Sequence, residues 1–457
     1  MHTTLLWFRR DLRLGDNPTL AYAAARGAVV PVAIEPPAHA PGAASEGWRA
    51  ASLAALDGSL RSRGVRLVVR RGSVEASLLA LVSETGVDVV ACTRSWDPAS
   101  LAEERRVAAA LSSAGVRLEV RESQYLVAPT DLHTGSGTPY QVFTPYYRAW
   151  LTALPIEPAL EVPARLKPPS VWPADDVWPE TGTTVDSRWR PGEAGAIERL
   201  TRFIDDHLSD YEALRDDPSA AATSELSPHL AAGEISPRQI RRAIADLPKA
   251  IVAPFLRQLA WREFSAHVLH AHPDLDRVPL KERFSSMPWI DDADGLERWR
   301  RGLTGYPLVD AGMRQLAATG WMHNRVRLVA ASFLVKDLLI SWTQGEEHFA
   351  AALVDADTAQ NAFNWQWVAG SGADAAPYFR IFNPSLQGKR FDPTGAYIRS
   401  WVPELAALPD QWIHEPWTAP ATERDRAADA AGSPYPEPLV DHAPARERAL
   451  AAYDSLR

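Results

Sequence analysis

The strongest constraint on the fold is a regular alternation of two sequence patterns over the first 125 residues. Five short runs of apolar, often β-branched residues occupy positions 3–8, 29–34, 66–69, 87–92 and 117–120. Alanine-rich stretches with helical spacing separate them, for example residues 18–26 and 101–112. Strands that alternate with helices are typical of a parallel sheet with helices on both faces. We therefore expect residues 1–127 to form an α/β domain with a Rossmann-like, five-stranded parallel sheet.

A sheet of this kind often holds a ligand in the crevice outside the carboxyl ends of its strands. The glycine-rich fingerprint of a dinucleotide site is missing, so nothing in the sequence marks a nicotinamide site. The charged stretch WFRRDLRLGDN follows the first apolar run. Its residues alone do not reveal its chemistry.

Proline marks the next part of the chain. It recurs at Pro129, Pro139, Pro145, Pro155, Pro158, Pro163, Pro168, Pro169, Pro173 and Pro179. Because proline is excluded from the interiors of helices and strands, we expect residues 128–198 to be an ordered interdomain linker on the surface. Strand patterns then disappear and helical periodicity takes over. We therefore expect residues 199–457 to form an all-α C-terminal domain.

Composition narrows the class of protein. At 457 residues, with 46% hydrophobic residues, the chain should be globular and contain two domains. Cys92 is the only cysteine, which excludes disulfides and thiolate metal sites and suits a reducing compartment. We see no signal peptide and no apolar run of the ~20 residues that a membrane helix needs. We expect a cytoplasmic monomer without a membrane partner.

The net charge of −9 argues only weakly against a nucleic-acid partner, since a local basic face can bind phosphates on an acidic protein. Three histidines, His267, His270 and His272, invite a metal interpretation. Their spacing does not place three imidazoles on one helix face, and we expect no metal.

Residues 320–368 are the most unusual part of the helical half. They combine carboxylates, asparagines and several tryptophans, of which the whole chain has 17. Apolar positions at helical spacing predict one helix from Asn324 to Trp342. Asn361 and Trp365 are four residues apart and should share a helix face. Such a face suits a planar ligand with a polar rim; the alternative is a buried helical core that is rich in tryptophan.

Hydroxyl side chains cluster farther upstream. The pairs Ser227-Pro228 and Ser236-Pro237 each predict an N-cap followed by proline at the first helical position. Thr223, Ser224 and Ser227 together could offer hydroxyls and backbone N–H groups to a phosphate. Plain helix capping is the alternative.

Several stretches together resemble one protein family. They are WFRRDLRLGDNPTL at the start, TSELSPHLAAGEISPRQI (223–240), FLRQLAWREF (255–264), DAAPYFRIFNPSLQGKRFD (374–392) and YIRSWVPEL (397–405). Together they resemble the photolyase/cryptochrome family, and most closely its class I cyclobutane pyrimidine dimer photolyases. The likeness runs almost from end to end in constant register.

The resemblance implies an α/β antenna-type domain and a helical domain that binds both FAD and DNA. The positions similar to the family's FAD ligands are Tyr211, Thr223, Ser224, Glu225, Leu226, Ser227, Arg327, Asp355, Ala356, Asp357 and Asn361. Asn361 and Asn324 would also serve the reaction beside the flavin ring. An amide at Asn361 could donate a hydrogen bond to the reduced flavin without adding negative charge.

The resemblance also implies a DNA surface and a route for electrons. The DNA-contacting positions are Arg215, Gln258, Trp261, Arg262, Asn324, Arg325, Val326, Trp367, Arg380 and Gln387. Trp365, Trp342 and Trp289 match a relay that carries electrons from the surface to the flavin. The implied partner is damaged DNA that contains pyrimidine dimers, repaired by an electron from excited reduced FAD. A cryptochrome-like photoreceptor, a (6-4) photolyase and a dark flavin oxidoreductase are the alternatives.

Some positions depart from the family pattern. Gln258 stands where an acid often faces the dimer, so it could donate a hydrogen bond but could not supply a proton. Leu328 replaces a common methionine. The stretch TRSWDP (93–98) lacks the element expected for a folate, so the antenna chromophore stays open between a deazaflavin, a folate, FMN and none.

Overall fold

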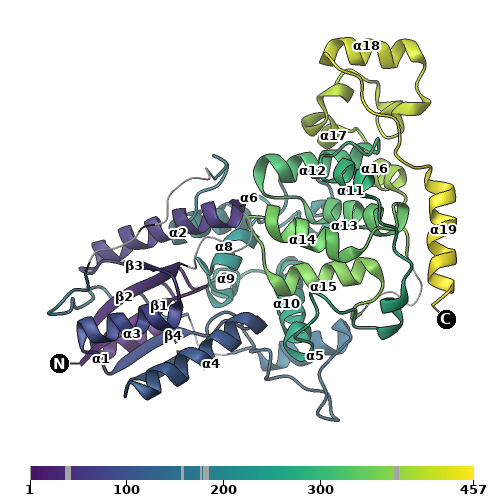
Figure 1. Ribbon diagram of the computed structural model, residues 1–457. Helices are drawn as coiled ribbons and strands as arrows, with labels where there is room; N and C mark the ends of the chain where they lie inside the picture. Colours follow the sequence, from purple (N-terminus) through teal and green to yellow (C-terminus); the bar gives the residue numbers. More distant parts are fainter. Residues whose placement is uncertain are drawn as a thin grey trace. The chain divides into compact units, whose positions relative to one another are not determined.

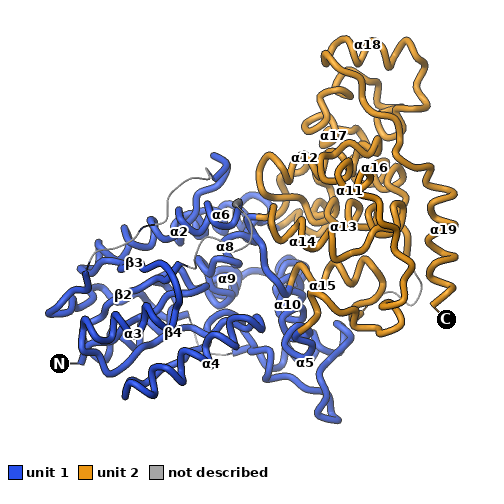
Figure 2. Tube along the Cα trace, in the orientation of Figure 1, with its two compact units in different colours: residues 1–208, 224–273, 354–359 blue, residues 209–223, 274–353, 360–457 orange. Residues whose placement is uncertain are grey.

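The computed structural model describes residues 2–35, 43–155, 159–174, 178, 185–374 and 380–456. The chain divides into two compact units, coloured separately in Figure 2. Unit 1 contains residues 1–208, 224–273 and 354–359, and unit 2 contains residues 209–223, 274–353 and 360–457. Each unit thus combines segments that are far apart in the sequence. The expected domain boundaries at 127 and 198 stay a prediction.

Unit 1 contains a parallel sheet, as expected. Its strands are β1 (His2–Phe8), β2 (Gly27–Glu35), β3 (Val68–Arg71), β4 (Val89–Thr93) and β5 (Arg117–Arg121). They are arranged in the order β3-β2-β1-β4-β5, and every neighbouring pair is parallel. The strand order reverses between β1 and β4, which places a switch point at the carboxyl ends of these two strands.

Helices cover the two faces of this sheet (Figure 1). They are α1 (Pro18–Arg26), α2 (Ala43–Ser62), α3 (Val74–Thr85) and α4 (Pro98–Ser113). Alternate residues of β1 enter different cores: Leu6 and Phe8 pack with residues of α1 and α2, and Leu5 and Trp7 pack with residues of α3 and α4. Successive side chains of a strand point to opposite faces, and both faces of β1 are buried, so the strand is apolar on both faces.

Local sequence explains where these helices begin. Asn17 accepts a hydrogen bond from the backbone N–H of Leu20 and precedes proline at the first position of α1. Asp97 does the same for Ser100 at the start of α4. An oxygen at the N-cap satisfies a backbone N–H that the helix leaves without a partner.

The charged stretch after β1 anchors the sheet to a distant segment of unit 1. That segment carries α8 (Ser227–Ala232), α9 (Pro237–Ala243) and α10 (Lys249–Ala271). The buried Arg13 guanidinium donates to the carbonyl oxygens of Gly15, Asp16, Ser123 and Gly233. These charge-assisted hydrogen bonds offset the free-energy cost of removing the guanidinium from water. The WFRRDLRLGDN stretch is therefore at least in part a structural clamp.

Glycine at position 233 makes the clamp sterically feasible. Its φ is +72°, and a Cβ there would lie 1.9 Å from the carbonyl oxygen of Arg10. The backbone of Leu12 donates to Ala232 beside it, over 3.3 Å. Only glycine permits this close approach together with the left-handed conformation.

The described part of the expected linker is ordered, but it is not free of regular structure. Its backbone pairs with the sheet domain at Val29–Lys167 and Asp16–Leu160. It also contains an eleven-residue helix, α5 (Phe143–Ala153), where we expected no helix. Pro145 is the third residue of α5, a position at which the missing N–H costs nothing. Helix α6 (Glu193–Asp206) completes unit 1.

Unit 2 is helical throughout its described residues. Its principal helices are α7 (Tyr211–Leu214), α11 (Ala293–Arg300), α12 (Pro307–Thr319), α13 (Asn324–Ser332), α14 (Trp342–Ala352), α15 (Thr358–Ala369), α16 (Pro384–Phe391), α17 (Ala396–Trp401), α18 (Ala421–Ala431) and α19 (His442–Asp454). Helix α15 begins in the last two residues of the unit 1 segment 354–359. The expectation of helices after the linker is confirmed.

The single helix expected from Asn324 to Trp342 is wrong. Helix α13 ends at Ser332, a π-helical turn (Phe333–Asp337) follows, and α14 starts at Trp342. Leu339 between them has a φ of +56°, which no helix permits, and Ser341 caps α14. Apolar spacing was a poor guide here because every residue from 329 to 340 is buried.

Two functional classes can be checked on the described residues. Among the described helices, none combines the length and apolar character that crossing a bilayer requires. Across the same residues, no group of three or more His, Cys, Asp or Glu side chains is arranged to hold a metal ion. His267 serves the fold, because its ring bonds to the backbone of Pro129 and Tyr140.

Candidate functional site

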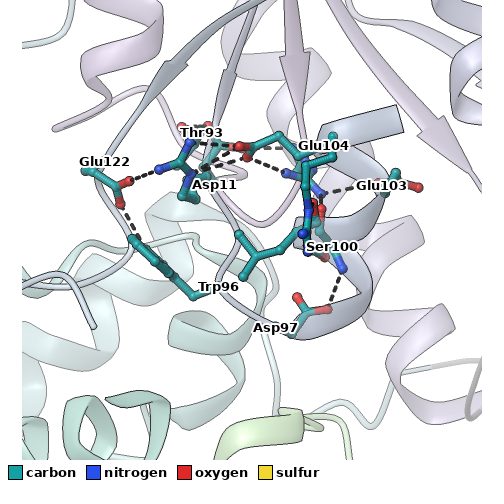
Figure 3. Close-up of polar contacts among 12 residues, drawn as sticks. Asp11, Thr93, Trp96, Asp97, Ser100, Glu103, Glu104 and Glu122 are labelled. Carbon is teal, nitrogen blue, oxygen red and sulfur yellow. Dashed lines mark hydrogen bonds and ion pairs between the residues drawn. The ribbon is translucent and has the colours of Figure 1, made fainter. Parts of the chain in front are cut away.

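The carboxyl ends of β1 and β4 carry a dense set of charges (Figure 3). Asp11 accepts hydrogen bonds from Asn17 and from Thr93, the latter over 2.7 Å. Arg94 pairs with Glu104 of α4 at 2.8 Å. Figure 3 also shows Trp96, whose indole N–H donates to Glu122 over 2.9 Å. Burial raises the pKa of the Glu122 carboxyl, against the effect of this bond.

A pocket opens beside these charges, within unit 1. Its lining comes from the loops after β1, β4 and β5, from α10 and from the segment 354–359: Arg10, Trp96, Asp97, Gln124, Tyr125, Ala266, Leu269, Asp357 and Ala359. Gln124 is 7% exposed, and its side-chain oxygen has no hydrogen-bond partner among the described residues. A buried oxygen without a partner is costly, and a cavity of about 10 Å³ suits a donor no larger than a water molecule.

Arg10 joins this pocket to the predicted FAD-binding loop at residues 355–357. Its guanidinium donates to the carbonyl oxygen of Ala356 over 3.1 Å. It also lies 3.8 Å from the carboxylate of Asp357 and 4.0 Å from that of Asp97. Asp355 and Asp357 are both buried. A fixed guanidinium therefore holds the shape and charge of a loop for which the family resemblance implies cofactor contacts.

The predicted phosphate loop has an unusual backbone at Glu225, whose φ is +47°. The Glu225 carboxylate is paired with the guanidinium groups of both Arg188 and Arg199. These two guanidiniums lie 4.8 Å and 4.7 Å from the ring of Trp189. The Glu225 carboxylate is thus engaged by the fold, and its cofactor role stays a prediction.

Ser227 is not the N-cap that we expected. It is the first residue of α8, and Leu226 precedes it without a side-chain cap. Thr223 and Ser224 are half-buried and Ser227 is exposed. At Ser236 the expectation is confirmed, because Ser236 and Gln239 form a complete capping box.

The predicted DNA-facing residues of unit 1 lie on α10. The ring of Trp261 is partly exposed and stacks on Phe143 of α5. Gln258 donates to the carbonyl of Pro254 in its own helix, over 3.1 Å. Arg262 donates to the carbonyl of Gln124 over 3.1 Å. The guanidinium of Arg262 is thus engaged by the fold, which weakens the case for a direct DNA contact.

Helix α10 also carries a buried carboxylate, Glu263, which is 1% exposed. It accepts hydrogen bonds from the backbone N–H groups of Leu126 and Val127 and from the indole of Trp150. Burial raises the pKa of Glu263 to about 7, although these bonds oppose the rise. Glu263 thereby ties α10 to α5 and to the chain that follows the sheet.

In unit 2, Asn361 has a partner that the sequence did not reveal. Its side-chain nitrogen donates to the Glu346 backbone oxygen over 2.9 Å and to the Glu346 carboxyl over 2.7 Å. Burial raises the pKa of Glu346 to about 7. Because both N–H groups of the amide are used, Asn361 would present its oxygen to a ligand. This differs from the donated hydrogen bond that we expected, since such an oxygen accepts.

Four other predicted residues begin helix α13. Asn324 is exposed, and His323 before it caps the helix. Arg325 pairs with Asp216 at 2.8 Å, and Arg327 donates to the carbonyl of Met322 over 2.8 Å. Val326 is fully buried, which weakens the case for a DNA contact at this position.

The tryptophans of the predicted relay occupy different environments in unit 2. Trp365 is 2% exposed, with its ring 5.0 Å from Phe349 and 6.2 Å from Trp299. A Cβ at Gly345 would lie 2.1 Å from the Trp365 ring, so glycine gives the indole its space. Trp342 is buried at the start of α14. Trp289 is partly buried against Phe284, Met287 and Leu339. The relay itself stays a prediction.

The remaining predicted positions are spread over unit 2. Tyr211 is buried, and the Arg215 guanidinium lies 5.4 Å from its ring. Trp367 and Gln387 are half-buried and Arg380 is exposed. Tyr378 and Phe379 of the quoted motif lie outside the described residues.

Comparison with known proteins decides the family. The model of the FAD-binding domain of DNA photolyase matches residues 255–455, and the DNA photolyase model matches residues 4–167. A deoxyribodipyrimidine photo-lyase from Agrobacterium fabrum is 46% identical over 468 residues, covering 99% of this chain and 98% of its own length. This chain belongs to the photolyase/cryptochrome family. Cryptochrome-1 of Arabidopsis thaliana is 36% identical, over 97% of this chain and 69% of its own length.

Solved structures of the same family agree with the fold. A bacterial class III photolyase from Agrobacterium tumefaciens superimposes with a TM-score of 0.94 at 44% identity, covering 100% of this chain and 98% of its own. An archaeal photolyase from Sulfolobus tokodaii, solved with two FAD molecules, gives a TM-score of 0.84 at 28% identity. It covers 99% of this chain and 100% of its own. The chain therefore has the architecture of photolyases over its whole length.

Proposed function

We propose that this chain is a DNA photolyase, a carbon–carbon lyase that uses light to split cyclobutane pyrimidine dimers in damaged DNA. The observation that supports this most is the full-length likeness to a class III photolyase, at 44% identity and a TM-score of 0.94. The same observation leads us to place the chain in class III rather than in class I, which the sequence motifs had suggested. We further propose a monomer that works in the cytoplasm.

Within unit 1, polar groups suit parts of FAD. Hydroxyls at Ser224 and Ser227 suit phosphates, and the buried carboxylate of Asp357, held by Arg10, suits ribose hydroxyls. Within unit 2, the amide oxygen of Asn361 would accept a hydrogen bond from a ring N–H. On absorbing blue or near-UV light, bound reduced FAD would supply one electron that opens the cyclobutane ring and then returns.

The protein's part is to extract the lesion and to hold it. A pyrimidine dimer stacks and pairs poorly, so extruding it from the duplex costs less than extruding normal bases. The partly exposed ring of Trp261 would stack on the extruded dimer, a contact worth ~1–3 kcal/mol per base. Exposed Arg380 would contact the phosphate backbone, which fixes register and makes binding depend on salt.

We also propose that the chain binds a second chromophore besides FAD. The archaeal structure with two FAD molecules is a precedent in the family. The absorption spectrum of the purified protein should show a second chromophore's band in addition to that of FAD. A spectrum of FAD alone would contradict this.

One assay tests the main proposal. Purified, reduced protein is illuminated with an oligonucleotide that carries a thymine dimer, and restored thymines are counted against a dark control. We expect light-dependent repair. A second oligonucleotide with a (6-4) photoproduct should remain unrepaired. The absence of repair in the light would instead favour a cryptochrome-like photoreceptor, for which the 36% identity to Arabidopsis cryptochrome-1 is the supporting observation.

In the same preparation, Trp261→Ala should weaken binding to the dimer oligonucleotide by ~1–3 kcal/mol, because the stacking surface is lost. FAD content should not change. Unaltered affinity would show that Trp261 is not the stacking ring.

A further inference from the structure

The ring of Phe143 lies flat on the ring of Trp261. The two centroids are 3.6 Å apart, and the ring planes differ by 7°. Phe143 is the first residue of α5, and Trp261 lies in the middle of α10. Most aromatic pairs adopt offset or edge-to-face geometry, so a parallel contact this close must be held in place by its surroundings.

The surroundings do hold it. The Tyr147 ring of the same helix lies 5.5 Å from the Phe143 ring at 15°, and the Arg257 guanidinium lies 5.3 Å from the Tyr147 ring. The four side chains thus form a series of contacts, called the column below, from Arg257 through Tyr147 and Phe143 to Trp261. Phe264 meets both stacked rings edge-on, at 5.8 Å from Phe143 and 5.8 Å from Trp261. Sliding or tilting of either ring would break several of these contacts.

The two helices that carry the column are joined independently of it. The Trp150 indole of α5 donates to Glu263 of α10 over 2.6 Å. The ring of Tyr146 packs on Phe264 at 5.0 Å. Figure 1 shows α5 alongside α10. Loss of the Phe143 ring should therefore free the plane of Trp261 without separating the helices.

We propose that Phe143 is a positioning residue for lesion binding. It covers one face of Trp261 and fixes the plane of the indole on which an extruded base would stack. This proposal rests on the proposed function, in which Trp261 is the stacking ring. Because the indole is already fixed, less conformational entropy is lost when the lesion binds, which is the general benefit of preorganisation.

A purely structural role for Phe143 predicts something different. Loss of core packing would lower stability and would weaken binding to damaged and undamaged DNA alike. A positioning role lowers affinity only for the dimer, and only while Trp261 is present. The ratio of the two affinities, and its dependence on Trp261, therefore separates the two roles.

The experiment is a double-mutant cycle on the FAD-loaded full chain. Dissociation constants are measured by anisotropy of an end-labelled single-stranded oligonucleotide, with and without one thymine dimer. The variants are Phe143→Leu, Trp261→Leu and the double variant. Phe143→Met replaces Phe143→Leu if the leucine variant fails to retain FAD, and Phe143→Tyr tests rescue by a ring. Phe203→Leu is the matched control, because this buried phenylalanine of α6 packs on Phe255 instead.

Phe143→Leu should weaken dimer binding by about threefold to tenfold and leave binding to undamaged DNA within about twofold. Phe143→Tyr and Phe203→Leu should retain the wild-type ratio. In the Trp261→Leu background, Phe143→Leu should have no further effect on the ratio. If Phe143→Leu changed the affinity ratio equally with and without Trp261, or left the ratio unchanged, this inference would be overturned and the proposed function would stand. Failure of the wild-type protein to prefer the dimer would overturn the proposed function and this inference with it.

Discussion

Glu263 provides a quantitative test of how the fold around α10 is held. Burial raises its pKa to about 7 from an ordinary value of 4.5, and the side chain is 1% exposed. A shift of this size corresponds to roughly 3 kcal/mol at 1.36 kcal/mol per unit. The folded protein binds the Glu263 proton more tightly than the unfolded chain does, so protonation of Glu263 stabilises the folded state. This contribution to the free energy of unfolding is complete below pH 4.5 and is lost as the pH rises through about 7.

The perturbation is Glu263→Gln, which removes the titration but keeps the shape. Glutamine offers one oxygen and one NH2 group, so at least one of the donors on Leu126, Val127 and Trp150 loses its acceptor. That loss should cost about 1–3 kcal/mol at low pH. The variant's free energy of unfolding should be lower than that of wild type, and this difference should shrink by roughly 2.5 kcal/mol between pH 5 and pH 8. At pH 8 the wild type carries a buried charge at Glu263 and the variant does not.

The assay is urea unfolding of both proteins at several pH values, with the free energy of unfolding compared pairwise. Comparison at each pH cancels all other titrating groups, among them Glu346. Glu198→Gln is the control, since Glu198 is an exposed residue of α6 paired with Arg202, and it should follow the wild-type profile. A constant difference between Glu263→Gln and wild type from pH 5 to pH 8 would refute the argument.

Three further predictions concern the cofactor. Trp365→Phe should slow photoreduction of oxidised FAD but spare repair by protein that is already reduced; equal loss of both would contradict the relay. Arg10→Ala should weaken FAD retention by about tenfold, measured by absorbance after dialysis, because the loop at Ala356 loses a charged donor; retention as in wild type would contradict this. Glu346→Gln should remove a pH dependence near 7 from the FAD reduction potential, since a carboxylate bonded to Asn361 gains its charge there; a wild-type dependence in the variant would contradict it.

The parallel sheet could be predicted because its signal is local. Each strand is a short run of apolar residues between helices, and only the bounds moved, as from 66–69 to Val68–Arg71 for β3. Burial on both faces makes such runs apolar throughout, so their ends are set by hydrogen bonds that the residue pattern does not contain. The overlooked helix α5 has the opposite cause, because a high density of proline concealed that Pro145 sits in a first turn.

The candidate site could be predicted as a set of positions but not as a set of interactions. Asn361 was found by resemblance, whereas its partner Glu346 belongs to the preceding helix and no spacing rule connects the two. Phe143 and Trp261 are likewise joined only by the packing of α5 on α10. The break between α13 and α14 was missed because helical periodicity has no meaning where all faces are buried.

The Arg13 clamp limits how this protein can be dissected. A fragment that ends at residue 127 would keep the whole sheet but would leave the Arg13 guanidinium without its acceptor at Gly233. Asp16 would at the same time lose Ser236 and Arg238. A fragment of the sheet domain that is meant to fold by itself should therefore include residues 224–243 as well, grafted or co-expressed.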